Sequence, residues 1–391
     1  MHVGIDAHKR TCTVCVIEDA AVRESFAFPT TREGIYEFME RIPSPATVVI
    51  EASTTGKVIS RMLADKYEIH MVAPPERKRP IKTDLRDAER IVREDMLQYL
   101  RRCYIPSAAI DEIRFLIFQQ IQVGRKIGRV KNQVHALLER NMIHDLDGFS
   151  DIFGVQGLRR MVTVHLPIQE KAALARYLEE LKLHAGHHRQ LETELARLAE
   201  SDTDALLLMS IPGIDFFTAL AIKGRIGDVT RFPTKKHLCS YGAVVPGASN
   251  SGEYVSRHNR VKHGDMILKS ALTCAVRGAV SAEKSSAVKR FYLKHSKRMG
   301  AQKAEVAAAR KMACIVWKVL TSHQPYREED KRLTARKRRI LSWKAKRQDS
   351  DPSDIRQLAE GLTGDVTVLE RYPVGFNEES RGGLPKECGR I

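Results

Sequence analysis

Two carboxylates three residues apart are the first candidates for chemistry in this chain. Asp84 and Asp87 follow Thr83 in a pattern that predicts the first turns of a helix, so both side chains would project from one helix face. Like charges this close repel unless a cation or a shared proton lies between them. Acidic residues are also common in the first turn of a helix without any catalytic role, because they interact favourably with the free backbone amides there. The functional interpretation therefore depends on whether other carboxylates reach the same place.

Two further carboxylates each end a short apolar run. Asp6 closes the run that begins at His2, and Glu51 closes a run of β-branched residues that begins at Thr47. Sites in α/β proteins lie at the carboxyl ends of strands, where such acids would meet. Asp6, Glu51, Asp84 and Asp87 together offer the all-oxygen ligand set that suits Mg²⁺ or Mn²⁺, the ions of phosphoryl transfer.

The elements that would position these acids follow a recognisable order. The hydrophobic pattern predicts three consecutive strands joined by tight turns, and then helices alternating with strands up to the helix that carries Asp84. The predicted strands cover 2–8, 11–18, 20–28, 47–51 and 68–73, and the predicted helices cover 31–42, 56–66 and a segment from 84 onward. This is the order of an α/β domain of the ribonuclease-H-like kind, in which acids from the first strand, the fourth strand and a later helix meet at one edge.

Size and charge narrow the class of protein. A chain of 391 residues accommodates two or three domains, and its net charge of +17 favours a polyanionic partner, most simply nucleic acid. No apolar run is long enough to span a bilayer and no signal peptide is apparent, so we expect a cytoplasmic protein with no membrane partner. Seven cysteines scattered through apolar patterns are typical of reduced thiols.

Two long helical regions follow. The first, about 108–142, carries a basic stripe that we expect to contact phosphates, with a solvated face as the alternative; its members are Arg125, Lys126, Arg129, Lys131 and Arg140. The second, about 168–202, has leucines spaced by threes and fours. This spacing predicts an antiparallel coiled-coil hairpin that turns near Gly186, or a plain packed helix pair. A coiled coil would favour a homo-oligomer.

The second half holds two further candidate sites. The turn around Gly213, which precedes a predicted helix, is similar to a helix–hairpin–helix clamp for a DNA backbone, and a purely structural turn is the alternative. Small polar residues between 238 and 252 predict an exposed loop, followed by the cations Arg257, Arg260 and Lys262. A serine in such a loop could attack a phosphodiester beside these cations, although Ser/Gly-rich turns are common without chemistry. From 326 to 391 we expect a basic, disordered segment that binds nucleic acid nonspecifically.

These motifs together resemble one family. Gly4–Lys9, Val49–Ser53 and Lys82–Ala88 are similar to the DEDD motifs of the IS110-type (IS110/IS1111) transposases. Two later segments, 211–232 and 241–252, resemble the C-terminal transposase domain of that family. The resemblance covers about residues 1–320 in the right order and does not include the segment after about 325.

The resemblance implies a domain plan and a mechanism. It implies a RuvC-like domain over 1–145, a linker and coiled coil over 146–203, and a helical transposase domain over 204–325. The family recombines DNA site-specifically, bridges donor and target with a structured guide RNA, and uses a serine with the acidic cluster. Position for position, that serine is Ser251, with Ser249 as the neighbouring candidate, and Asp215 departs from the second glycine usual in helix–hairpin–helix clamps.

Two other functions remain compatible with the residues. In a RuvC-like junction-resolving nuclease, a metal-activated water would cut the DNA and Ser251 would have no role. A noncatalytic nucleic-acid-binding protein could also be built on a nuclease fold.

Overall fold

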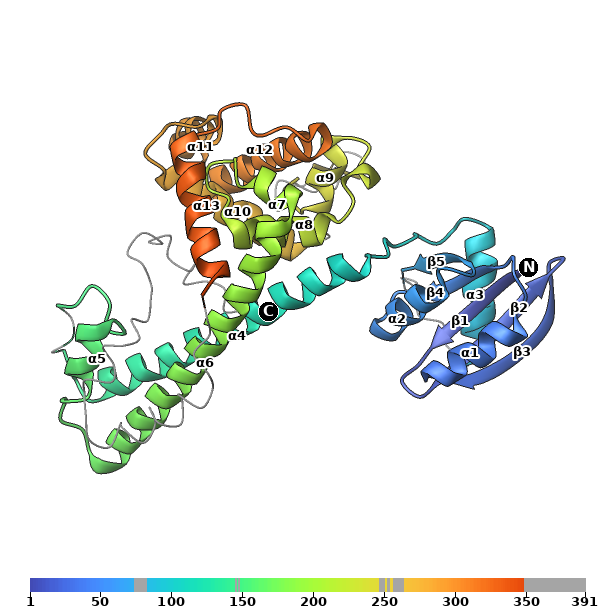
Figure 1. Cartoon of the computed structure of the whole chain (residues 1–391), viewed down its shortest axis with the longest axis horizontal. Coiled ribbons are helices and arrows are strands. Elements are labelled where there is room, and N and C mark those ends of the chain that lie inside the picture. The colour runs from blue at the N-terminus through green and yellow to red at the C-terminus, as the bar shows by residue number, and fades with distance from the viewer. Residues whose placement is uncertain are drawn as a thin grey trace. The chain divides into compact units, whose positions relative to one another are not determined.

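The computed structural model of the protein describes residues 1–73, 83–144, 146, 148–245, 250–251, 254–255 and 264–347 (Figure 1). Backbone contacts divide the chain into two units, Met1–Ala109 and Ile110–Ile391. The long helix that begins at Ala108 packs into the apolar core of the second unit. The expected domain ends near residues 145, 203 and 325 remain predictions.

The first unit is built on one mixed sheet of five strands in the order β3-β2-β1-β4-β5. β1, β2 and β3 form an antiparallel meander, and β4 and β5 run parallel to β1, in agreement with the predicted order of elements. The strands are β1 (His2–Ala7), β2 (Thr11–Glu18), β3 (Ala21–Pro29), β4 (Thr47–Glu51) and β5 (Glu68–Val72). The arrangement is consistent with an RNase H-like domain.

Helices cover both faces of this sheet (Figure 1). α1 (Arg32–Arg41) and α2 (Thr54–Leu63) pack Phe38 and Ile59 against one face, in a core that includes Ile5 of β1. α3 (Asp84–Met96) packs on the other face through Ala88 and Val92. The middle residues of β1 and β4 are therefore buried on both faces of the sheet, which explains why these strands read as nearly continuous apolar runs.

The second unit is helical apart from one short pair of strands in its described residues. Most of its helices surround one large apolar core, to which the start of α4 and the end of α6 also contribute. The elements are α4 (Ala108–Arg140), α5 (Val155–Met161), α6 (Ile168–Ser201), α7 (Thr203–Leu208), α8 (Phe216–Ile226), η1 (Val229–Arg231), α9 (Lys235–Tyr241), β6 (Asn250–Ser251), β7 (Tyr254–Val255), α10 (Met266–Ser281), α11 (Ala287–Met299), α12 (Ala301–Ser322) and α13 (Lys331–Ala345).

The predicted hairpin within 168–202 is wrong, because α6 is a single helix that runs through Gly186. α4 is the helix that runs beside α6, and the two pack through a second core with the segment around α5 (Figure 1). Gln120 of α4 also hydrogen-bonds His188 of α6, at 3.0 Å between Nε2 atoms. A glycine within a helix costs only about 1 kcal/mol, which this packing outweighs.

The expected disorder of the segment 326–391 is also wrong in part. Residues 331–345 form the helix α13, which buries Thr334 and Leu341. Residues beyond 347 lie outside the described part of the chain. Across the described ranges, every helix is too short or too polar to cross a lipid bilayer.

Candidate active site

Asp6 and Glu51 lie side by side at the carboxyl ends of two parallel strands. Ile5 of β1 pairs with Ile50 of β4, so the next residue of each strand stands at the same sheet edge. Side chains alternate between the two faces along a strand. Because Gly4 and Val49 face α3, Asp6 and Glu51 share that face two residues further on.

α3 brings the other two carboxylates to this edge. Thr83 caps the helix by accepting a hydrogen bond from the Arg86 amide, at 3.4 Å, and Asp84 and Asp87 follow in the first turn. The helix can lie this close because β1 has a glycine at position 4. A Cβ at Gly4 would stand 2.2 Å from the carbonyl oxygen of Ala88.

His8 links two of the acids, and the sequence analysis assigned it no role. Its Nε2 lies 3.2 Å from Oδ2 of Asp6 and 3.3 Å from Oδ1 of Asp84. Its backbone is held by Thr11 and Thr30, since the His8 amide donates to the Thr11 carbonyl and the Thr30 hydroxyl donates to the His8 carbonyl. The signal was present in the sequence, because residues 6 and 8 share a face by strand alternation.

Asp6, His8 and Asp84 form a donor set that fits a divalent ion. Within the described residues, their ligand atoms all lie within 4.8 Å of one another. Two ligands at right angles around Mg²⁺ stand about 3 Å apart, close to the two separations at His8. Burial raises the pKa of Asp6, the nearby charges of Asp84 and Asp87 raise it further, and His8 opposes the shift. A bound cation would offset the same costs of ionisation.

Glu51 and Asp87 stand at the same edge but outside this compact group. Asp87 accepts a hydrogen bond from Nη2 of Arg90 at 3.2 Å, one turn along α3. Arg90 also reaches Glu94, so Asp87 belongs to a chain of charges along the helix. The structure thus gathers Asp6 and Asp84 closely and places Glu51 and Asp87 beside them.

The far end of α3 is fixed by a buried carboxylate. Asp95 is 3% exposed and lies 2.6 Å from Nδ1 of His70 in β5. Arg102 donates to both Asp95 oxygens, at 3.2 and 3.3 Å. α3 is therefore held by polar contacts at its C-terminal end and by close packing on β1 near its N-terminal end.

Ser251 belongs to the second unit. Its backbone lies in β6, where it pairs with Tyr254 of β7 in an antiparallel arrangement. Ser249 and the three cations Arg257, Arg260 and Lys262 lie outside the described residues.

The basic stripe of α4 divides into two groups. Arg125, Lys126 and Arg129 are exposed, as a phosphate-binding surface requires. Lys131 is instead partly buried, with its Nζ 4.6 Å from the ring centre of Phe153, and burial lowers its pKa. Lys131 therefore packs against the segment around α5 rather than presenting a free charge.

Gly213 is required at its turn by both its backbone conformation and its close packing against α10. Gly213 has φ of +89°, and a Cβ there would stand 2.0 Å from the Ala275 carbonyl of α10. Asp215, the departure from the clamp pattern, caps α8 by accepting from the Thr218 amide at 2.8 Å. Lys337 of α13 covers the turn from another side, because its ammonium group donates to the carbonyls of Met209, Ile211 and Ile214.

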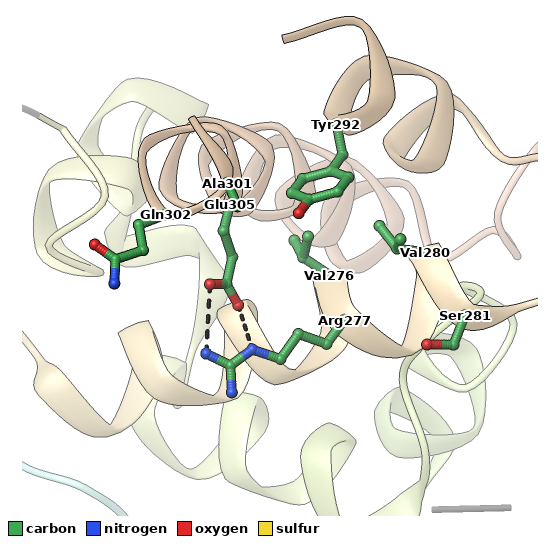
Figure 2. A pocket seen from close by; sticks show the side chains of 8 residues that line it. All are labelled: Val276, Arg277, Val280, Ser281, Tyr292, Ala301, Gln302 and Glu305. Carbon is green, nitrogen blue, oxygen red and sulfur yellow. Dashed lines mark hydrogen bonds and ion pairs between the residues drawn. The ribbon is translucent and has the colours of Figure 1, made fainter. Parts of the chain in front are cut away.

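A cavity of about 280 Å³ lies among α10, α11 and α12 (Figure 2). Its wall is largely apolar, and at one side Arg277 donates hydrogen bonds to both carboxylate oxygens of Glu305. Since this ion pair already neutralises the carboxylate and none of the predicted site residues lines the cavity, it is not a candidate for the acid chemistry above.

Two family models match the chain, one over the first unit and the start of the second, the other within the second unit. One, a transposase model of the IS110 DEDD type, matches residues 3–143, which include all four acids and His8. The other, described as the transposase IS116/IS110/IS902 family, matches residues 205–293, which include Ser251. The chain belongs to the IS110-type transposase family. It is accordingly an enzyme of the DNA transposase and recombinase class.

Similar proteins carry the same description. The transposase for insertion sequence element IS1111A of Coxiella burnetii is 31% identical over 35% of this chain and 38% of its own length. A probable family 20 transposase of Pseudomonas aeruginosa is 26% identical over 76% of this chain and 90% of its own length. The transposase for insertion sequence element IS1328 of Yersinia enterocolitica is 24% identical over 70% and 82%.

Proposed function

We propose that this IS110-type protein cuts and rejoins DNA strands with an acid-bound divalent ion and a serine nucleophile. The observation that carries the proposal is the convergence of Asp6 and Asp84, from segments far apart in the sequence, with Glu51 and Asp87 at the same sheet edge. We expect the ion to be Mg²⁺ or Mn²⁺, held by the four acids with His8. When bound, such an ion neutralises charge on the scissile phosphate.

The four acids and His8 would contribute to the proposed metal site in different ways. Asp6 and Asp84 supply negative charge at one point, and His8 lies between them. Glu51 and Asp87 extend the acidic edge on the α3 side, with Arg90 orienting Asp87.

The serine oxygen would bond to phosphorus as the bond from phosphorus to one deoxyribose oxygen breaks. The serine proton leaves to solvent and the departing sugar oxygen takes up a proton. The resulting phosphodiester between DNA and protein keeps the energy needed for rejoining.

Cleavage assays test the acids. Asp6→Ala and Asp87→Ala should abolish metal-dependent strand cleavage while the far-ultraviolet circular dichroism and the melting temperature still report a folded protein. Asp65→Ala is the matched control, because it removes an exposed acid of the same unit that lies after α2. Full cleavage by Asp6→Ala would refute the proposed metal site.

A denaturing gel tests the serine. Wild type should form a protein–DNA adduct that survives denaturant, and Ser251→Ala should not, whereas Ser249→Ala should retain it. An adduct from Ser251→Ala would refute the assignment. Cleavage to free ends without any adduct would instead support the water-based mechanism of a junction-resolving nuclease.

The partners follow from the proposed reaction. DNA element ends and target DNA are the substrates, and the family resemblance supplies a structured guide RNA and a coiled coil within 146–203 as further expectations. A coiled coil would favour a homo-oligomer. We expect the reaction to take place in the prokaryotic cytoplasm, at the nucleoid. Sequencing of RNA that copurifies with the protein tests the guide, and sedimentation at micromolar concentration tests the oligomer.

A further inference from the structure

α13 is a strongly basic helix that lies outside both segments matched by the family models. Between Lys331 and Arg347 the sequence contains no Asp or Glu. Its basic side chains fall into two groups with different surroundings, and this division indicates two different roles.

The first group attaches α13 to the rest of the second unit. Lys337 donates to three carbonyls of the turn at 209–214. Lys344 lies 2.6 Å from Oε1 of Glu192 in α6, and Arg347 donates to the Thr193 hydroxyl at 2.9 Å. These contacts, together with buried Leu341, fix the position and the rotation of the helix.

The second group forms a stripe on the opposite side. Its members are Arg332, Arg336, Arg339, Trp343 and Lys346, spaced by four, three, four and three residues. At about 100° per residue, all five lie within about 40° of the direction directly opposite Leu341. Arg332, Arg339 and Lys346 are exposed, and Trp343 is 64% exposed.

Trp343 is the informative member of this stripe. An indole ring of this size is usually well buried, yet here it lies in the middle of a row of cations. Cations that follow a phosphate backbone, together with an aromatic ring on which a base can stack, are the combination that binds single-stranded nucleic acid. An acidic protein would complement the charges but would give no reason for an exposed ring among them.

We propose that this stripe of α13 binds unpaired nucleotides, with a base stacked on Trp343 and phosphates on Arg332, Arg339 and Lys346. The site is separate from the acid cluster and from Ser251. It would hold a single-stranded segment of RNA or of DNA through the same contacts. The Asp87→Ala variant should therefore retain this binding even if it loses cleavage, which separates the two proposals experimentally.

Tryptophan fluorescence provides a local test in the full-length protein. The chain has two tryptophans, and Trp317 is partly buried with its Nε1 donating to the Phe232 carbonyl at 3.0 Å. Addition of a short oligothymidylate or oligouridylate should quench the Trp343 emission, and Trp343→Leu should remove the quenching. Affinity for the oligonucleotide, from fluorescence anisotropy, should fall roughly 5- to 150-fold in Trp343→Leu and much less in Trp343→Phe. The tighter-bound of the two oligonucleotides identifies the strand as DNA or RNA.

Salt dependence tests the cations. The triple variant Arg332→Ser, Arg339→Ser, Lys346→Ser should lower the slope of log affinity against log salt by about 2, since each phosphate contact on a single strand contributes about 0.7. Lys294→Ser, Lys297→Ser, Arg298→Ser is the matched control, because it removes the same charge from exposed positions of α11. Unchanged affinity in Trp343→Leu, equal losses in both triple variants, or duplex DNA binding as tightly as the single strand would each overturn the proposal.

Discussion

Gly4 sets how closely α3 approaches the sheet, so Gly4→Ala should separate the acids without unfolding the domain. A Cβ at this position would lie 2.2 Å from the Ala88 carbonyl oxygen and 2.4 Å from Cγ2 of Val92, whereas real Cβ contacts begin near 3.0 Å. The Val92 methyl group belongs to a side chain and can rotate. The carbonyl is backbone, so α3 must move away by about 0.8 Å or more to accommodate the new methyl group.

The displacement acts directly on the proposed centre. Asp84 and Asp87 move with α3, while Asp6 and Glu51 stay with the sheet. Misplacement of reacting groups by about 1 Å can cost about 100-fold in rate, and overpacking costs about 1–3 kcal/mol of unfolding free energy. Since domains are stable by about 5–15 kcal/mol, the variant should remain folded and lose activity.

The assay compares the rate of metal-dependent strand cleavage with the urea unfolding curve. Gly128→Ala is the matched control, because a Cβ there meets no atom within 4 Å and alanine favours a helix. Cleavage by Gly4→Ala at the wild-type rate, with a folded and metal-bound protein, would refute the inference that α3 and β1 share the catalytic centre.

Three further predictions concern single side chains. His8→Ala should weaken Mn²⁺ binding about 10- to 100-fold and Mg²⁺ binding less, because imidazole favours transition metals. Titration calorimetry measures both affinities, and unchanged Mn²⁺ binding in the variant would show that His8 is not a ligand. Asp95→Ala should lower the unfolding free energy measured in urea by about 3 kcal/mol, because His70 loses its buried partner. Asp65→Ala should lower it little, and an equal loss in both variants would contradict this prediction. Lys337→Met should lower the melting temperature, because three carbonyls lose their donor. Burial lowers the pKa of Lys337 to about 8, below the value of 10.5 in the unfolded chain. Between pH 8 and 10 the unfolded state therefore binds more protons than the folded state, so the unfolding free energy of the wild type should rise with pH relative to that of Lys337→Met. A difference in unfolding free energy that stays constant over this range would refute the burial of the Lys337 ammonium group.

The sheet and its acids could be predicted because local signals determine them. Apolar runs of β-branched residues end at Asp6 and Glu51, and Thr83 marks the start of α3. Strand alternation then places the acids on one face without any long-range information. The same rule would have identified His8, but a histidine just beyond a strand end is not distinctive by residue type.

The failures have a common cause in contacts between segments distant in sequence. The path of α6 through Gly186 depends on packing with α4, and a single glycine could not reveal that. α13 looked disordered because its partners, Glu192 and the 209–214 turn, are more than a hundred residues away. Lys131 was expected to be free because nothing local indicated that Phe153 would cover it.

α3 carries two of the proposed catalytic acids at one end and its buried anchor, Asp95, at the other. Its thirteen residues span about 20 Å, from the proposed catalytic centre to the anchorage of Asp95 on His70 and Arg102. Because α3 is a single continuous helix, a shift at the Asp95 anchorage is carried along the helix towards Asp84 and Asp87. Substitutions around Asp95 should therefore alter the spacing of the acids from the opposite end of the helix.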